Sequence, residues 1–243
     1  TEQNYLEPWE NPKFYDITGS GVIIKDNRIL TSAHVVSGSN FVQVQKENDS
    51  KKYDATVKYI SNDVDLAILE INDKTFFANT KALEISEDVK IKDSVTAIGY
   101  PIGGNTISTT NGIVSRIEYK SYSWNPWANY LTIQIDAAIN SGNSGGAVIN
   151  KDNKIVGIAM MKLTHADNIG YIVPSVVINT FLNDIKDNKV DGLSSTQTIV
   201  SYIENQDMKD YLGLHDDLGI LITRVDIEDI ELQESDVLIS ING

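Results

Sequence analysis

The segment INSGNSGGAVIN, residues 139–150, places two serines among glycines and asparagines and then continues into an apolar run. Gly142, Gly145 and Gly146 reach backbone angles that other residues adopt only at a cost, so the chain can bend sharply there before a strand begins at Ala147. Such a segment is either a surface turn or the loop of a nucleophilic serine. Because a serine hydroxyl needs a base to attack at neutral pH, the rest of the sequence has to decide.

Short runs rich in β-branched residues surround this segment from Gly19 onward, separated by turn clusters. Their length and spacing predict an all-β sandwich or barrel. A polar stretch, residues 83–94, divides them into two halves of similar size. After Pro174 a helix-like spacing of apolar residues closes the first domain; these residues are Val176, Val177, Ile178, Phe181, Leu182 and Ile185.

The two ends of the chain differ from this β-rich body. After a linker at Asp191 and Gly192, residues 211–226 and 236–243 predict two short strand pairs with no closing element, so we expect an incomplete second module. At the N-terminus, prolines exclude regular structure around residues 4–16, and aromatic side chains on such an arm are expected to dock on another surface. These aromatic residues are Tyr5, Trp9, Phe14 and Tyr15.

Composition excludes several classes of function. Twenty basic and 34 acidic residues give a net charge of -14, which repels phosphate backbones and anionic lipid, so we expect no nucleic-acid partner. No run approaches the roughly 18 apolar residues of a membrane span, so we expect no membrane insertion. The polar, acidic N-terminus predicts that a signal or transit peptide is absent or already removed.

The absence of cysteine excludes disulfides, thiolate zinc sites and a cysteine nucleophile. With only three histidines, a site of several histidine ligands is disfavoured, and we expect neither a metal nor a cofactor. The simplest interpretation of His165 and His215 is that both are solvated loop residues. His34 remains as the candidate base.

Three residues in chain order carry the candidate chemistry: His34, Asp65 and Ser144. Taken alone, His34 is more simply a hydrogen-bonded core histidine, and Asp65 a strand-end cap. Asp65 nevertheless precedes an apolar strand and is better placed than Asp63 to point inward and hold an imidazole. The order histidine, aspartate, serine on an all-β background is that of the chymotrypsin-type barrel, whereas other folds with this triad use other orders.

Between the two serines of the opening segment, Ser144 is the predicted nucleophile and Ser141 lies in the approach loop. The residues before the two glycines can aim backbone N–H groups at a developing oxyanion. We expect the N–H groups of Gly142 and Ser144 to hold that charge and Asn143 to shape the loop. The predicted chemistry is acyl transfer to Ser144, with His34 moving the proton and Asp65 orienting His34.

Several motifs resemble the DegP/HtrA family of serine proteases, most closely its plant-type Deg branch: LTSAHVV (30–36), DLAIL (65–69), GYPIGG (99–104), IQIDAAINSGNSGGAV (133–148) and NIGYIVP (168–174). The resemblance covers nearly the whole chain. It implies an oligomerisation arm at residues 1–18, a double β-barrel protease domain at 19–190, and an incomplete PDZ domain at 193–243. The peptide-binding loop of that PDZ domain would be Tyr211, Leu212, Gly213 and Leu214.

The family resemblance also implies what the protein does and with what. It implies ATP-independent degradation of unfolded or damaged proteins, often with chaperone behaviour, by trimers or multiples of trimers that use the N-terminal arm. It favours a non-cytosolic compartment. The chain departs from some bacterial members in having no long insertion between GVII (21–24) and RILTS (28–32), so regulation through that loop is not expected. A non-proteolytic chaperone or PDZ adaptor, and an esterase, remain as alternatives.

Substrate preference follows from the segment before the nucleophile. Six residues before Ser144, where a trypsin-like pocket needs an acid, stands Ala138. By the family pattern Ile139 lines the primary pocket, and the loop after the following strand forms another wall. We therefore expect small or medium aliphatic residues at the cleaved position. The residues of that second wall are Met160, Met161, Lys162 and Leu163.

Overall fold

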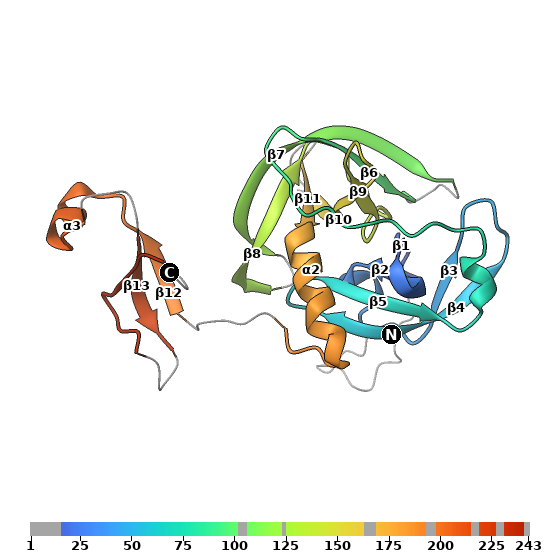
Figure 1. Cartoon of the computed structure of the whole chain (residues 1–243), viewed down its shortest axis with the longest axis horizontal. Coiled ribbons are helices and arrows are strands. Elements are labelled where there is room, and N and C mark those ends of the chain that lie inside the picture. The colour runs from blue at the N-terminus through green and yellow to red at the C-terminus, as the bar shows by residue number, and fades with distance from the viewer. Residues whose placement is uncertain are drawn as a thin grey trace, which may run out of the picture. The chain divides into compact units, whose positions relative to one another are not determined.

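The computed structural model describes residues 16–101, 106–122, 125–162, 169–192, 198–214, 219–226 and 231–240. The side chains of residues 121–122, 125–129 and 161–162 lie outside this description. The chain divides into two compact units, Thr1–Gly192 and Leu193–Gly243, and each is described by itself (Figure 1). The predicted oligomer contacts Tyr5, Trp9 and Phe14 lie outside the described residues.

The first sheet is an antiparallel half-barrel with strand order β1-β2-β5-β4-β3. This half-barrel is the first of the two β-domains that the predicted double-barrel fold contains. A short helix, α1 (Ala33–Val36), follows β2 and carries His34. The strands are β1 Val22–Ile24, β2 Arg28–Thr31, β3 Val42–Gln45, β4 Lys52–Ser61 and β5 Leu66–Ile71.

The second sheet closes into a barrel in the order β10-β11-β8-β7-β6-β9, in which β9 pairs with both β6 and β10. The segment 139–150 contains β9, so Ser141 and Ser144 lie in the loop that leads into this strand of the barrel. The strands are β6 Ser94–Gly99, β7 Ser108–Tyr122, β8 Asn125–Ile135, β9 Ala147–Ile149, β10 Ile155–Lys162 and β11 Gly170–Pro174. The prediction of an all-β fold is confirmed.

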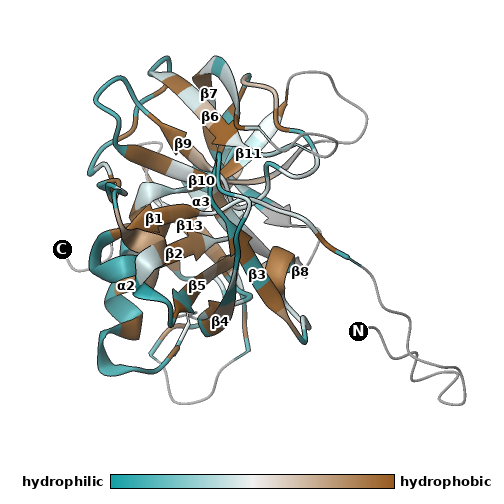
Figure 2. Cartoon of the chain, turned by 90° about the vertical axis from the view of Figure 1, so that its right-hand side faces the viewer, coloured by the Kyte–Doolittle hydropathy of each residue, from teal (hydrophilic) through white to brown (hydrophobic). Residues whose placement is uncertain are grey.

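Helix α2 (Ser175–Asp184) follows β11, as the apolar spacing after Pro174 predicts. Its residues Ile178 and Phe181 are buried in a core shared with both sheets, while Val176 on the opposite face is 53% exposed. The half-barrel contributes Leu30, Leu66 and Ile68 to this core, and the barrel contributes Ile155, Ile158 and Tyr171. In Figure 2 most of the hydrophobic colour lies on the strands and most of the hydrophilic colour on the loops. The same apolar cluster therefore joins half-barrel, barrel and α2.

The connection between the two sheets is held by backbone hydrogen bonds to both of them. The N–H of Leu83 donates to Ile23 of the half-barrel over 3.0 Å. Three residues further on, the N–H of Ser86 donates to the carbonyl of Ile155 in the barrel over 2.8 Å, and the N–H of Ile155 donates back to the carbonyl of Glu84. Short 3-10 turns complete this unit at Lys25–Asn27, Lys74–Phe77 and Ile185–Asp187.

The second unit contains a three-stranded sheet with order β12-β13-β14 and one helix. Its elements are β12 Thr198–Tyr202, α3 Gln206–Tyr211, β13 Ile220–Val225 and β14 Val237–Leu238. The expected strand from residue 211 was wrong, because α3 extends to Tyr211 and a turn follows at Leu212 and Gly213. The helix is capped by Asn205, whose side chain accepts the N–H of Asp207, a cap that the sequence prediction missed.

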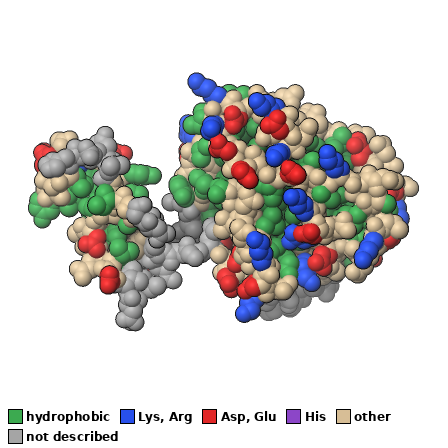
Figure 3. All heavy atoms as spheres, viewed as in Figure 1, with side chains coloured by type: hydrophobic (Ala, Val, Ile, Leu, Met, Phe, Trp, Pro, Cys, Tyr) green, Lys and Arg blue, Asp and Glu red, His purple; other side chains and the backbone are tan. Residues whose placement is uncertain are grey.

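The surface carries both signs of charge. On the face of the first unit seen in Figure 3, Lys and Arg side chains alternate with Asp and Glu, so that face has no continuous basic patch. Among the described residues, no helix is both long and apolar enough to cross a membrane. In the same residues, no three His, Cys, Asp or Glu side chains gather in a way that could hold a metal ion.

The shared core yields a prediction for stability. Phe181→Ala removes a ring that is 3% exposed at the meeting of α2 with both sheets, and we expect the free energy of unfolding to fall by about 3–5 kcal/mol. The matched change on the exposed face of the same helix, Val176→Ala, should cost no more than about 0.5 kcal/mol. Urea denaturation of both variants measures the difference. Equal losses would show that α2 does not close this core.

Candidate active site

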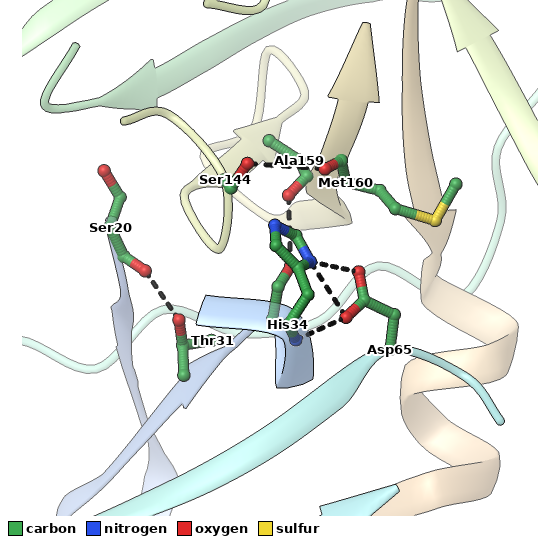
Figure 4. A network of polar contacts seen from close by, with 8 residues as sticks. Ser20, Thr31, His34, Asp65, Ser144, Ala159 and Met160 are labelled. Atoms are coloured by element: carbon green, nitrogen blue, oxygen red, sulfur yellow. Dashed lines mark hydrogen bonds and ion pairs between the residues drawn. The ribbon is translucent and has the colours of Figure 1, made fainter. Parts of the chain in front are cut away.

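His34 and Asp65 are held together by several hydrogen bonds (Figure 4). The imidazole Nδ1 lies 2.8 Å from Asp65 Oδ2 and 3.0 Å from Oδ1. The backbone N–H of His34 also donates to Oδ1 over 2.8 Å, and the N–H of Ala33 donates to the Asp65 carbonyl over 3.1 Å. Because the carboxylate can only accept, Nδ1 carries a proton in this arrangement, which leaves Nε2 as the basic nitrogen of a neutral ring.

Burial distinguishes Asp65 from its neighbour Asp63. Asp65 is 3% exposed, and its hydrogen bonds compensate for a carboxylate that would be costly to bury alone, whereas Asp63 is exposed. Asp65 also has a φ of +54°, in the left-handed region that aspartate tolerates better than most residues. This turn of the backbone, directly before β5, aims the side chain at α1 rather than along the strand.

Ser144 lies in a tight loop between β8 and β9. The N–H of Asn143 donates to the carbonyl of Asn140 over 2.9 Å, and the N–H of Gly146 donates to the carbonyl of Asn143 over 2.8 Å. Within the described part of the chain, the N–H groups of Gly142 and Ser144 have no acceptor. Two unpaired donors on either side of Asn143 are the arrangement that an oxyanion hole requires.

The glycine after Ser144 is required by both conformation and space. Gly145 has a φ of +83°, and a Cβ at this position would lie 2.3 Å from the carbonyl oxygen of Ser20 and from Thr31 Oγ1. Its N–H donates to Ala159 of β10 over 2.8 Å. The loop therefore packs directly against β2 of the half-barrel, which leads into α1 and His34.

The Ser144 hydroxyl has one proton, and in this structure it donates that proton to the carbonyl of Met160 over 3.4 Å rather than to His34. Met160 lies at a register shift between β10 and β11, where bulges redirect backbone groups. In Figure 4 the imidazole lies between Asp65 on one side and Ser144 on the other. Hydrogen bonds between a nucleophile and its base are often long or poorly aligned without substrate and tighten when substrate binds.

Sequence reasoning overlooked Ser20, which lies 7% exposed just before β1. Its N–H donates to the carbonyl of Ser144, and its hydroxyl donates to the carbonyl of Gly142, each over 2.8 Å. The hydroxyl also accepts the N–H of Tyr100. Burial, with the nearby charge of Glu47, raises the pKa of the Tyr100 phenol, which therefore stays neutral at physiological pH. A serine between glycines near the N-terminus carries no sequence signal for these contacts.

The structure places some of the predicted pocket residues and not others. Ile139 is 5% exposed and packs against Gly170, where an added Cβ would lie 2.5 Å from the Ile139 side chain. Ala138 is half-buried, and its carbonyl accepts the hydroxyl of Thr110. Met160 is buried. The side chains of Met161 and Lys162, although both residues belong to β10, and the whole of Leu163 lie outside the described residues.

The structure describes the predicted peptide-binding loop of the second unit, residues 211–214, but not the four residues that follow it. Tyr211 is 84% exposed at the end of α3, and Leu212 and Leu214 are half-buried. Gly213 has a φ of +69°, and the N–H of Leu214 donates to the carbonyl of Lys209. These residues form the C-terminal end of a helix, and a PDZ role for them stays a prediction.

Comparison with known proteins supports the relationship that the motifs indicate. Residues 19–158 match the family described as the trypsin-like peptidase domain. The chain is 38% identical to putative protease Do-like 3, mitochondrial, of Arabidopsis thaliana, over 98% of this chain and 43% of the relative. It is 40% identical to the serine protease DegP homolog of Plasmodium falciparum (isolate 3D7), over 93% of this chain and 27% of the relative. The chain thus spans less than half the length of these relatives.

A solved structure, the HtrA-type protease AlgW with tripeptide, superposes with a TM-score of 0.72 at 26% identity, covering 90% of this chain and 73% of that one. The trypsin-like match extends over more than half of this chain and includes His34, Asp65 and Ser144. The chain therefore belongs to the trypsin-like peptidase family and is homologous to the Do-like, DegP and HtrA proteases.

Proposed function

We propose that the protein is a serine endopeptidase in which His34, Asp65 and Ser144 form the catalytic triad. The observation that carries this proposal is the hydrogen bond from His34 Nδ1 to the buried Asp65, 2.8 Å long, beside a serine whose loop presents two unpaired N–H groups. A structural histidine or a strand-end aspartate would account for one of these features. Neither explanation accounts for the position of the His34–Asp65 pair beside the loop of Ser144.

The proposed reaction is acyl transfer. Ser144 Oγ attacks the scissile carbonyl while His34 Nε2 takes its proton, and Asp65 stabilises the imidazolium that forms. The N–H groups of Gly142 and Ser144 donate to the oxyanion of the tetrahedral intermediate. His34 then gives the proton to the leaving amine, and water repeats these steps to release the acyl group and restore Ser144.

We propose unfolded or damaged proteins as substrates, cleaved without ATP and with chaperone activity toward some of them. Support comes from the Do-like and DegP relatives and from the AlgW structures, whose titles name bound peptides. The related Arabidopsis proteins are named mitochondrial or chloroplastic, which supports an organelle compartment for this protein too. We also propose that Leu193–Gly243 belongs to a PDZ domain and that residues 1–18 assemble trimers or multiples of trimers.

The triad assignment is tested by changing each serine of the loop in turn. Ser144→Ala should abolish both hydrolysis of an unfolded protein and covalent labelling by a fluorophosphonate, because the attacking oxygen is gone. The control Ser141→Ala changes an exposed neighbour and should leave both intact. Intact mass reads the labelling, with and without unfolded protein present. Labelling or hydrolysis that survives in Ser144→Ala would show that Ser144 is not the nucleophile. A parent protein that never labels would favour the chaperone or adaptor alternative.

Asp65→Asn tests the orienting role. The amide has only one accepting oxygen. If its NH₂ group faces Nδ1, the imidazole proton moves to Nε2, and a protonated Nε2 cannot accept the proton of Ser144. We expect kcat for peptide hydrolysis to fall on the order of 10⁴-fold. Asp63→Asn, the exposed neighbour, is the control and should retain parental activity. A parental kcat in Asp65→Asn would remove Asp65 from the mechanism.

Specificity is tested with a peptide library. Because Ala138 and the buried Ile139 present no charge, we expect Val, Ala, Leu or Ile at the cleaved position to exceed Lys and Arg. Discrimination among aliphatic residues should stay within the roughly 10–200-fold that one or two methylene groups provide. Ile139→Ala should shift the preference toward larger side chains. A preference of the parent for Lys or Arg would contradict this view of the pocket.

A further inference from the structure

The hydroxyl of Ser20 is at the centre of a chain of hydrogen bonds whose direction is determined. The Tyr100 N–H can only donate, so Ser20 Oγ accepts from it over 2.8 Å. The Gly142 carbonyl can only accept, so the single proton of Ser20 goes to it, also over 2.8 Å. The result is one ordered chain from Tyr100 N–H through Ser20 Oγ–H to Gly142. Each bond in such a chain polarises the next.

This chain fixes the peptide plane between Gly142 and Asn143 at both of its polar ends. The carbonyl of Gly142 is held by Ser20, and the N–H of Asn143 is held by Asn140 over 2.9 Å. Because the peptide unit is planar, two such bonds determine its orientation. The N–H groups of Gly142 and Ser144, one on each side of this plane, are the two that have no acceptor in the described structure. Ser20 also donates its own N–H to the Ser144 carbonyl, so it holds the loop on both sides of the nucleophile.

A second observation indicates that the loop needs this contact. Asn143 is 4% exposed, and its Oδ1 is buried without a hydrogen-bond partner in the described part of the chain. An unsatisfied buried acceptor destabilises the conformation that contains it. Gly99 leaves room for both groups, since a Cβ there would lie 2.8 Å from Asn143 Oδ1 and 3.0 Å from Ser20 Oγ. The glycines around Ser144 permit other loop conformations, so this one requires an external constraint.

We propose that the Ser20 hydroxyl is a positioning group for the oxyanion hole: by holding the Gly142 carbonyl, it keeps the N–H groups of Gly142 and Ser144 directed at the reacting carbonyl. This role deepens the proposed peptidase function and rests on it. Ser20 touches neither substrate nor the reacting atoms, so it acts through the loop. Its hydrogen bonds run from the segment before β1 to the loop before β9, and the alignment of the hole with His34 depends on them.

Ser20→Ala in the full chain tests this role. The alanine removes the donor for Gly142 and leaves the backbone contacts of residue 20 in place. We expect kcat for peptide hydrolysis to fall roughly tenfold or more, toward the hundredfold that loss of an oxyanion donor costs. KM should stay within about twofold, because the lost interaction is made in the transition state. Ser20→Cys, with a thiol of similar shape and weaker donor strength, should lie between parent and alanine.

The matched control is Ser86→Ala, which removes a serine hydroxyl of similar burial, 6% exposed, that donates to the Asp88 carbonyl away from the site. Its kcat should equal that of the parent, and its midpoint of thermal unfolding should fall as much as that of Ser20→Ala.

A parental kcat in Ser20→Ala, or a rise in KM alone, would overturn the positioning role. If the parent does not hydrolyse the peptide, the peptidase function itself fails, and if Ser144→Ala hydrolyses it as the parent does, the assignment of Ser144 as nucleophile fails. If Ser144→Ala is inactive while Ser20→Ala is fully active, only the role of Ser20 fails.

Discussion

The apolar core shared by the half-barrel, the barrel and α2 is the feature on which the rest of the structure depends. His34 and Asp65 come from the half-barrel and Ser144 from the barrel, so neither sheet alone contains the site. Burying Leu66, Ile158 and Phe181 in one cluster removes apolar area from water only when the two sheets face each other. The catalytic geometry is a consequence of that packing.

Hydrophobic packing brings the half-barrel and the barrel together without fixing their alignment, and polar contacts at the edge of the core fix it. The buried Ser32 hydroxyl donates to the Ala159 carbonyl across the two sheets, and Ser20 donates to Gly142 in the same way. Since buried donors and acceptors are costly to leave unpaired, each contact penalises a shift of one sheet against the other. Apolar packing therefore brings the residues of the site close together, and the hydroxyls of Ser20 and Ser32 orient the segments that carry them.

The sequence predicted the fold class, which the structure confirms, but not the contacts that hold the loop of Ser144 in place. Alternating apolar runs identified the strands, and the order of His34, Asp65 and Ser144 suggested their roles because each chemistry demands a particular residue type. Ser20 carried no such signal, since its contacts exist only once distant segments meet. Helix α3 was not predicted for a local reason, namely that the Asn205 cap at its start was overlooked. Residues whose role is set by tertiary contacts cannot be recognised from spacing alone.

The central claim is that residues from two sheets act as one catalytic unit, and a double-mutant cycle of His34→Ala and Ser144→Ala tests it most directly. Rates of peptide hydrolysis are measured for the parent, both single variants and the double variant. The account predicts that each single change costs about as much as both together, because either one disables the same step. Losses that multiply in the double variant would mean that the two residues act independently, and would contradict the account.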